Sequence, residues 1–427
     1  RVTIPVIVGG KEIKTGKTQP IIAPHNKSLK LGVYHQAGKK EILAAIKAAK
    51  EAYTTWSSMP WEDRAAIFLK AADLISVKYR HILNASTMLG QSKSVFQAEI
   101  DSTCELADFF RFNAHYMTQI YRDQPLINPH GIWNRLEYRP LEGFVFAVTP
   151  FNFTSIAGNL PTAPAIMGNV VIWKPSSASM LSSWYIMKLL KDAGLPDGVI
   201  NMVPGRGKDI ADTVLNHKDL AGIHFTGSTR VFTSMWKTVG ENLSKGLYKN
   251  YPRIVGETGG KDFIFAHPDC DVKGLAVAVT RGSFEYQGQK CSAVSRIYVP
   301  SSIWKNVLKE IKSMTSKIKM GDVADFKTFM GAVINKEAFD KITGYIEYAR
   351  KSKKANIVIG GDYNDSKGYF IEPTVITTTD PHFKLLEEEI FGPVVTVYVY
   401  DDKKINETLS LLDSTSPYAL TGAVFAK

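Results

Sequence analysis

The stretch FVFAV at residues 144–148, which follows Gly143, opens the part of the sequence that decides the fold. Further apolar runs of strand length follow at residues 170–173, 199–203, 222–225 and 254–255, with helical patterns between them. The clearest helix is predicted over residues 180–193, where Gly194 and Pro196 should end it. Strands that alternate with helices predict a parallel, doubly wound α/β sheet, and ligands of such sheets bind beyond the carboxyl ends of the strands.

Upstream of this region the hydrophobic period is helical from Lys39 onward. One predicted helix presents a single apolar face made by Ile42, Ile46, Ala49 and Tyr53. A second is predicted to open after Pro60, with one face made by Ala66, Leu69, Asp73 and Val77. A third is predicted from about residue 94 to residue 112. Residues 1–35 read as short strands broken by glycine and proline.

Two boundaries divide the chain, whose 427 residues exceed what one core usually holds. Residues 121–141 are punctuated by proline, asparagine and glycine, and carry one short alternating strand at 133–138. A second α/β region begins near residue 259. We therefore predict a first domain of residues 1–120 and 142–258, an excursion at 121–141, and a second domain at 259–427.

The composition is typical of a soluble globular protein, with 44% hydrophobic and 22% charged residues. No run of about 18 apolar residues occurs, so no membrane span is expected. Cysteines stand only at 104, 270 and 291, without a CxxC pair, which argues against a disulfide framework or a metal site and favours a reducing compartment. The net charge of +11 suits anionic substrates and cofactors, and leaves nucleic-acid binding as a minor alternative because the lysines are scattered.

Polar residues follow the predicted strands at four places. Asn152 can donate its amide to a developing oxyanion, or can form an Asx-turn. Lys174 can hold ribose or phosphate groups, or can be an ordinary surface lysine. Gly227 and Ser228 form a glycine turn before a helix, which suits a pyrophosphate but also an ordinary serine cap. Glu257 precedes a glycine pair, either as a reactive carboxylate or as a salt-bridged one before a hinge.

Cys291 is the cysteine with unusual neighbours. Glycine precedes it, and Lys290 and Ser292 flank it. A positive charge nearby stabilises a thiolate, and Lys290 can supply that charge. By itself a lone cysteine is more often a small core residue than a nucleophile.

The order of these motifs resembles the aldehyde dehydrogenase superfamily over the whole chain. The resemblance rests on PFNF around Asn152, WKPS around Lys174, ETGG at Glu257, GQKCSA around Cys291 and EIFGP at residues 389–393. A closer resemblance is to the Δ1-pyrroline-5-carboxylate (glutamate-γ-semialdehyde) dehydrogenases of proline catabolism. It rests on residues 105–113, 150–154, 284–286 and 413–418, and on Phe151, where general aldehyde dehydrogenases typically carry tryptophan.

The resemblance implies a role for each motif. It makes Cys291 the nucleophile, Asn152 the oxyanion donor and Glu257 the general base for hydrolysis, and it implies a Rossmann-like NAD-binding domain. The expected NAD-binding residues are Thr149, Phe151, Lys174, Ser177, Gly227, Ser228, Glu389 and Phe391. The expected substrate-binding residues are Glu105, Phe153, Lys290 and Ser292.

Three departures from the family pattern qualify these roles. Phe232 stands where the superfamily often has a second glycine after Gly227. Ser177 replaces an acidic residue that many NAD-selective members use, so NADP is expected as a weaker second cofactor. The sequence ends at Lys427, before the segment that in the family grips the substrate carboxylate and closes the flap of the dimer.

The resemblance also implies a setting and leaves alternatives. Residues 121–141 match the oligomerisation flap of the family, so a homodimer or an assembly of dimers is expected. The branch works in the mitochondrial matrix of eukaryotes and in the bacterial cytoplasm. The start at Arg1, without methionine, indicates a front that is processed, trimmed or disordered. The alternatives are a broad-specificity aldehyde dehydrogenase, a non-catalytic relative of the same fold, and an RNA-binding protein.

Overall fold

The computed structural model describes residues 1–427 and divides into two compact units. The first unit comprises Arg1–Ile21, Lys30–Gly90 and Phe96–Glu257. The second comprises Ile22–Leu29, Gln91–Val95 and Thr258–Lys427. The two short segments Ile22–Leu29 and Gln91–Val95 therefore differ from the predicted division, which placed all of residues 1–120 in the first domain. The roles assigned to the predicted domains stay predictions.

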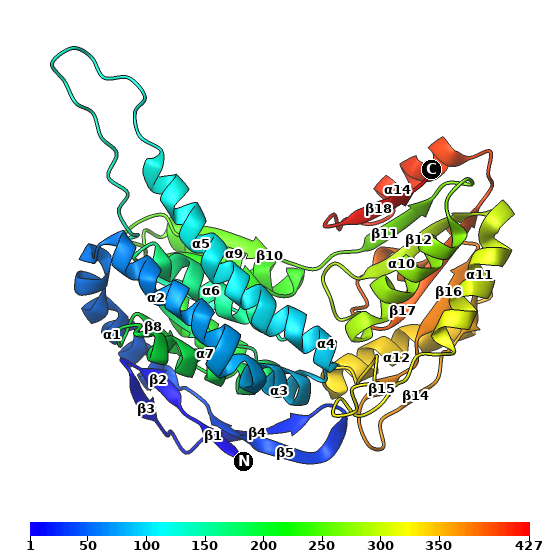
Figure 1. The fold of residues 1–427 in the computed structure, drawn as a ribbon, viewed down its shortest axis with the longest axis horizontal. Helices are drawn as coiled ribbons and strands as arrows, with labels where there is room; N and C mark the ends of the chain where they lie inside the picture. The colour runs from blue at the N-terminus through cyan, green and yellow to red at the C-terminus, as the bar shows by residue number, and fades with distance from the viewer. The chain divides into compact units, whose positions relative to one another are not determined.

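A seven-stranded sheet forms the centre of the first unit (Figure 1). Its strands lie in the order β10 (Arg253–Glu257), β9 (Leu220–Thr226), β6 (Phe144–Val148), β7 (Val170–Lys174), β8 (Ile200–Met202), β2 (Val6–Val8) and β3 (Lys11–Ile13). The strands from β10 to β8 are parallel to one another, and β2 and β3 continue the sheet antiparallel. The predicted doubly wound α/β fold is confirmed.

Helices flank this sheet because their apolar faces need a partner to be buried against. They are α1 (Lys39–Ser58), α2 (Trp61–Leu74), α3 (Arg80–Gln91), α4 (Val95–Ala98), α5 (Glu105–Arg122), α6 (Thr154–Ile166), α7 (Met180–Ala193), α8 (Gly207–Val214) and α9 (Thr229–Ser244). Two π-helical turns, Ile75–Tyr79 and Glu99–Cys104, interrupt the series, and a 3₁₀ turn occupies Ser177–Ser179. Helix α7 has the predicted bounds, and Gly194 ends it in the left-handed conformation that glycine adopts without steric cost.

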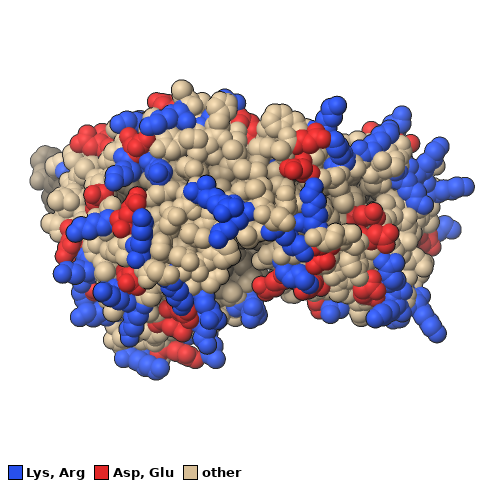
Figure 2. Space-filling model, turned by 90° about the horizontal axis from the view of Figure 1, so that it is seen from below, with Lys and Arg blue, Asp and Glu red and all other residues tan.

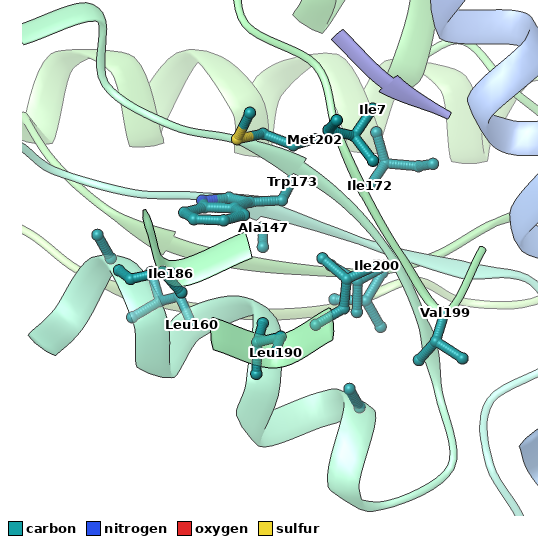
Figure 3. Close-up of a cluster of buried hydrophobic side chains, with 14 of the residues drawn as sticks. Ile7, Ala147, Leu160, Ile172, Trp173, Ile186, Leu190, Val199, Ile200 and Met202 are labelled. Carbon is teal, nitrogen blue, oxygen red and sulfur yellow. The ribbon is translucent and has the colours of Figure 1, made fainter. Parts of the chain in front are cut away.

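Trp173 on β7 and Trp56 on α1 are the largest fully buried side chains in the core of the first unit, and Trp173 has no exposed surface. Figure 3 shows its indole beside Leu160 of α6 and Ile186 of α7. The indole nitrogen donates a hydrogen bond to Oγ1 of Thr149 at 3.0 Å. The core therefore holds the first residue of the loop that follows β6.

The predicted face of α2 was wrong. Leu69 and Asp73 are exposed, and Val77, which lies beyond the end of α2, is 79% exposed. The buried face carries small alanines, Phe68 and Arg64 instead. Arg64 can be buried because its guanidinium donates hydrogen bonds to the carbonyl of Ile166 and to the hydroxyl of Tyr121.

The third predicted helix is longer than expected, because α5 continues to Arg122 and buries Ala114 and Met117 in its added turns. No strand forms at residues 133–138, where an alternating strand was predicted. Residues 123–143 form a long loop beyond the end of α5 (Figure 1, cyan), with Leu126 99% and Trp133 77% exposed. A lone alternating segment forms a strand only when a neighbouring strand satisfies its backbone groups.

The second unit is built on a six-stranded sheet with the order β13 (Ala355–Ile359), β16 (Thr374–Thr378), β17 (Val394–Tyr400), β12 (Val294–Pro300), β11 (Asp262–Ala266) and β18 (Gly422–Phe425). All pairs are parallel except β13 with β16. Its helices are α10 (Val272–Phe284), α11 (Ser301–Thr315), α12 (Lys336–Lys351), α13 (Lys384–Glu387) and α14 (Ile405–Ser414), with a 3₁₀ turn at Glu285–Gly288.

Two small strand groups complete the fold. Strands β1 (Val2–Ile4), β5 (Asn26–His35) and β4 (Thr18–Ala23) form a three-stranded sheet, and β14 (Tyr363–Asn364) pairs with β15 (Phe370–Ile371). None of the helices combines the length and apolar character that crossing a membrane requires. Lysine and arginine side chains are scattered among acidic ones on the face in Figure 2, which offers no continuous basic stripe for a nucleic-acid backbone.

Candidate active site

In the first unit the expected site residues stand at the carboxyl ends of four adjacent parallel strands. Thr149–Phe153 follow β6, Lys174 ends β7, Gly227 and Ser228 follow β9, and Glu257 ends β10. The register pairs Val148 with both Lys174 and Phe225, and Glu257 with Thr226, so these strand ends are level. This edge is where a doubly wound sheet binds its ligands.

The loop after β6 is held firmly by the strand next to it. The backbone N–H of Thr149 donates to the carbonyl of Lys174 at 3.2 Å, and its hydroxyl accepts from Trp173. Asn152 is buried, with only 4% of its surface exposed. Phe153 has extended backbone angles and precedes the first turn of α6. A buried amide on a fixed loop is preorganised to donate a hydrogen bond.

Lys174 carries an ammonium group that no other side chain of the structure engages. It is partly buried at the end of β7, and it makes no side-chain hydrogen bond or ion pair. Burial lowers the pKa of Lys174 to about 8. A partly desolvated cation without a protein partner at a sheet edge is suited to bind a polar or anionic ligand. Ser177, three residues later, is exposed at the start of the 3₁₀ turn.

Gly227 and Ser228 form the turn between β9 and α9. A Cβ on Gly227 would lie 2.7 Å from the ring of Phe225, so only glycine fits there. The hydroxyl of Ser228 accepts a hydrogen bond from the N–H of Val231 at 3.4 Å and caps the 16-residue helix α9. The remaining N–H groups of this first turn favour an anionic ligand.

Phe232, which departs from the family pattern, has a clear position. Its ring stacks on Phe225, with centroids 5.2 Å apart. It also covers Gly256, where a Cβ would lie 2.2 Å from the Phe232 ring. The phenylalanine therefore fills the space above Gly256 beside the turn, and the glycine at 256 makes room for it.

In the second unit, Cys291 lies on a loop between α10 and β12. The three cysteines differ in exposure: Cys104 is exposed, Cys270 is buried and Cys291 is partly buried. The loop begins with three successive residues at positive φ, namely Tyr286 at 50°, Gln287 at 55° and Gly288 at 65°. After the cysteine, the N–H of Ala293 donates to the carbonyl of Lys290 at 3.1 Å and turns the chain into β12.

Glycines bring three motifs of the second unit into direct contact. A Cβ on Gly259 would lie 2.2 Å from the carboxylate of Glu389, and one on Gly260 would lie 2.8 Å from the carbonyl oxygen of Cys291. The N–H of Gly260 donates to Oε1 of Glu389 at 3.2 Å. A Cβ on Gly288 would lie 2.2 Å from the carbonyl oxygen of Gly392. These glycines permit close packing, and they follow directly on the boundary between the two units at Glu257 and Thr258.

Glu389 lies in the centre of this arrangement. Burial raises the pKa of the Glu389 carboxyl, while the nearby ammonium of Lys341 and the N–H of Gly260 oppose the rise. Phe391, two residues after Glu389, adopts a positive φ of 60°, a conformation rare outside glycine. The carboxylate and the cysteine loop therefore share one packed neighbourhood within the second unit.

Lys290 does not act as an isolated charge beside the cysteine. Its ammonium lies 3.2 Å from Oε2 of Glu285, and Arg281 pairs with the same carboxylate at 3.0 Å. Burial alone would raise the pKa of Glu285, but Lys290 and Arg281 overcome that effect and lower it. Glu285 is a site neighbour that the sequence reasoning missed. Ser292 is exposed.

Glu105 begins α5 in the first unit, where it is partly buried and accepts a hydrogen bond from the hydroxyl of Ser155. Ser155 stands in the first turn of α6, shortly after Asn152. This hydrogen bond therefore joins Glu105 to α6, the helix that follows the PFNF loop. Sequence reasoning missed Ser155, whose only signal was its place two residues after Phe153.

A third missed residue is Lys261, directly after the ETGG motif. Its side chain is buried, and its Nζ has no hydrogen-bond partner. Burial, followed by the positive charge of Arg296, lowers the pKa of Lys261 to about 7.

Comparison with known proteins gives consistent results. A family model described as "Aldehyde dehydrogenase family" matches residues 12–427. The mitochondrial delta-1-pyrroline-5-carboxylate dehydrogenase of Dictyostelium discoideum is 51% identical over 427 residues, which cover 100% of this chain and 76% of that protein. The human protein of the same name is 47% identical, with 99% and 75% covered.

Solved structures agree in fold. The NAD-bound delta-pyrroline-5-carboxylate dehydrogenase from Mycobacterium tuberculosis superposes with a TM-score of 0.95 at 47% identity, and the match covers 100% of this chain and 78% of that one. The NAD-bound Thermus enzyme has a TM-score of 0.93 at 31% identity, with 100% and 81% covered. The predicted family is therefore confirmed, and the chain belongs to the aldehyde dehydrogenase family.

Proposed function

We propose that this chain oxidises L-glutamate-γ-semialdehyde, the open form of Δ1-pyrroline-5-carboxylate, to L-glutamate with NAD. The observation that carries the proposal is the packing of the Cys291 loop against the Gly259–Gly260 pair and the Glu389 loop. It gathers the loop of the proposed nucleophile and a carboxylate suited to ribose hydroxyls around the same glycine pair. Relatives near 50% identity bear the name of this activity, and two solved neighbours hold NAD.

The proposed reaction uses the residues of the chain in a fixed order. The Sγ of Cys291 bonds to the aldehyde carbon, the π bond of the carbonyl breaks, and the thiol proton passes to the carbonyl oxygen, which gives a thiohemiacetal. The Asn152 amide and the Cys291 N–H donate hydrogen bonds to its oxygen. When bound, NAD supplies the acceptor for the hydride that leaves this carbon. Glu257 takes a proton from the water that hydrolyses the resulting thioester, which releases L-glutamate.

Several residues fit the cofactor. The ammonium of Lys174, which lacks a protein partner, would hold ribose hydroxyls, and the capped turn at Ser228 would receive the pyrophosphate. Thr149, Phe151 and Gly227 would line the same edge, and Ser177 leaves room for weaker use of NADP. Glu389 would likewise hold ribose hydroxyls, and Phe391 would contact the cofactor beside it. Glu105, Phe153, Lys290 and Ser292 would bind the substrate, with Glu105 facing its α-ammonium group.

We also propose a setting for the enzyme. The exposed apolar side chains of residues 123–143, among them Leu126, Ile127 and Trp133, would pair with a second copy in a homodimer or an assembly of dimers. The names of several eukaryotic relatives include "mitochondrial", which supports the mitochondrial matrix as the compartment.

The deciding experiment follows NADH absorbance with the full-length protein. Its kcat/KM is compared for pyrroline-5-carboxylate, propanal and succinate semialdehyde at equal NAD. A clear preference for pyrroline-5-carboxylate supports the proposal. A preference for the simple aldehydes would instead identify a broad-specificity enzyme, and no turnover of any of them a non-catalytic relative.

Lys174 gives the cofactor site a pH dependence. Below a pKa of about 8 the side chain is charged and attracts the cofactor, and above it this attraction is lost. The dissociation constant of NADH, measured by its fluorescence, should therefore rise as the pH increases through 8, by roughly tenfold or more. Lys174→Met should bind weakly already at neutral pH, with a flat profile over the same range. An unchanged profile in this variant would exclude Lys174 as the group responsible.

A further inference from the structure

The turn that precedes Cys291 has an unusual backbone. Tyr286, Gln287 and Gly288 follow one another at positive φ, and two of the three carry side chains. Left-handed conformations are costly for residues with a Cβ, and they normally occur singly. Such conformations persist only where surrounding contacts impose them, and they concentrate at functional sites.

The contacts that impose this turn come from a segment nearly 200 positions earlier in the chain. The hydroxyl of Tyr286 donates to the carbonyl of Gln91 at 3.0 Å, and Nε2 of Gln287 donates to the carbonyl of Ser92 at 3.1 Å. The ammonium of Lys93 lies 4.3 Å from the centre of the Tyr286 ring, and Lys93 is fully buried. All of these residues belong to the second unit.

A third segment of the chain completes the arrangement. Gln287 also donates to the carbonyl of Ala332 at 2.7 Å and accepts from the N–H of Gly331 at 3.0 Å. The N–H of Ala332 donates to Oγ of Ser92 at 2.9 Å. Ser92 itself has a positive φ of 56° and no exposed surface. The side-chain amide of Gln287 therefore joins two separate stretches of backbone, and Ser92 links the same two stretches.

We propose that the segment Gln91–Lys93, acting through Tyr286 and Gln287, is a brace that positions the Cys291 thiol for attack. Tyr286 and Gln287 are positioning residues, since the brace acts on the reacting sulfur through the loop they begin. The proposal rests on Cys291 being the nucleophile. A loop held at both Gln287 and the Gly288–Gly392 contact cannot shift the cysteine without breaking buried hydrogen bonds.

The test compares two tyrosines that make the same kind of bond. Tyr286→Phe removes the bond to Gln91, and Tyr400→Phe removes the buried bond from Tyr400 to the carbonyl of Ala266 at 2.6 Å, at the opposite end of β11. The rate of Cys291 alkylation by iodoacetamide is measured across pH without substrate. Peptide mass spectrometry separates Cys291 from the exposed Cys104. Gln287→Met, which loses three bonds, is the stronger second variant.

Tyr286→Phe should change the alkylation rate of Cys291 by about tenfold and lower kcat in parallel, with KM for NAD unchanged. Gln287→Met should have a larger effect of the same kind, while Tyr400→Phe should lower only the melting temperature. Equal alkylation profiles for Tyr286→Phe and Tyr400→Phe would overturn the brace. If Cys291 of the unmodified protein reacts no faster than Cys104, the nucleophile assignment itself fails, and the brace falls with it.

Discussion

Replacing Cys291 with alanine is expected to abolish steady-state NADH production, with a loss of roughly 10⁴-fold or more. Alanine removes the sulfur that would bond to the aldehyde carbon, so no thiohemiacetal forms and no hydride is released. Cys291 is partly buried on a loop, and its backbone carbonyl packs against Gly260. The fold should therefore tolerate the change, which thermal unfolding would verify.

The control for this prediction is Cys104→Ala. Cys104 is exposed, and its thiol donates a weak hydrogen bond to Oε1 of Glu99 at 3.7 Å. Its replacement should leave kcat within about twofold, in line with the small effect of most surface substitutions. Turnover by Cys291→Ala at a rate within tenfold of the unmodified enzyme would show that another group attacks the aldehyde.

The buried strands of the first unit were predictable because their sequences are continuous apolar runs. Residues 144–148 form β6 as expected, and the helix at 180–193 begins and ends at the predicted residues. In both places the local pattern and the tertiary burial agree. The carboxyl ends of the predicted strands also indicated where Asn152, Lys174 and Glu257 would lie.

The failures arose where long-range packing overrides the local pattern. The buried face of α2 includes Arg64, which the hydrophobic period counts as polar, because its hydrogen-bond partners come from α6 and α5. The expected strand at 133–138 does not form, since its alternation is local but its pairing partner is not. Neither outcome could be derived from neighbouring residues.

The surroundings of Cys291 show the same limit. Sequence motifs identified the cysteine, the Gly259–Gly260 pair and Glu389. They did not explain why positions 259 and 260 require glycine. The reason is steric, because the three motifs approach within van der Waals distance in the second unit. The segment at Gln91–Lys93 carries no recognisable motif, and only the fold places it on the turn before the nucleophile.

Changing Glu257 to glutamine is expected to separate the two halves of the reaction. Glutamine keeps the size of the side chain but cannot accept a proton, so the thioester should form and then hydrolyse slowly. Rapid mixing with NAD and pyrroline-5-carboxylate should give a burst of one NADH per active site. The steady rate that follows should be roughly 10²- to 10⁴-fold lower than that of the unmodified enzyme.

The burst is the decisive part of this prediction, because a general loss of activity would lower both phases. Glu257 is exposed at the end of β10, so its replacement should not weaken the core. Glu241→Gln, on the exposed side of α9 and paired only with Lys237 at 3.8 Å, is the matched control and should show neither effect. Mass spectrometry of the quenched Glu257→Gln protein should find an acyl group on the peptide that contains Cys291. A burst without that adduct would place the slow step after hydrolysis, and a full steady rate would assign the proton transfer to another residue.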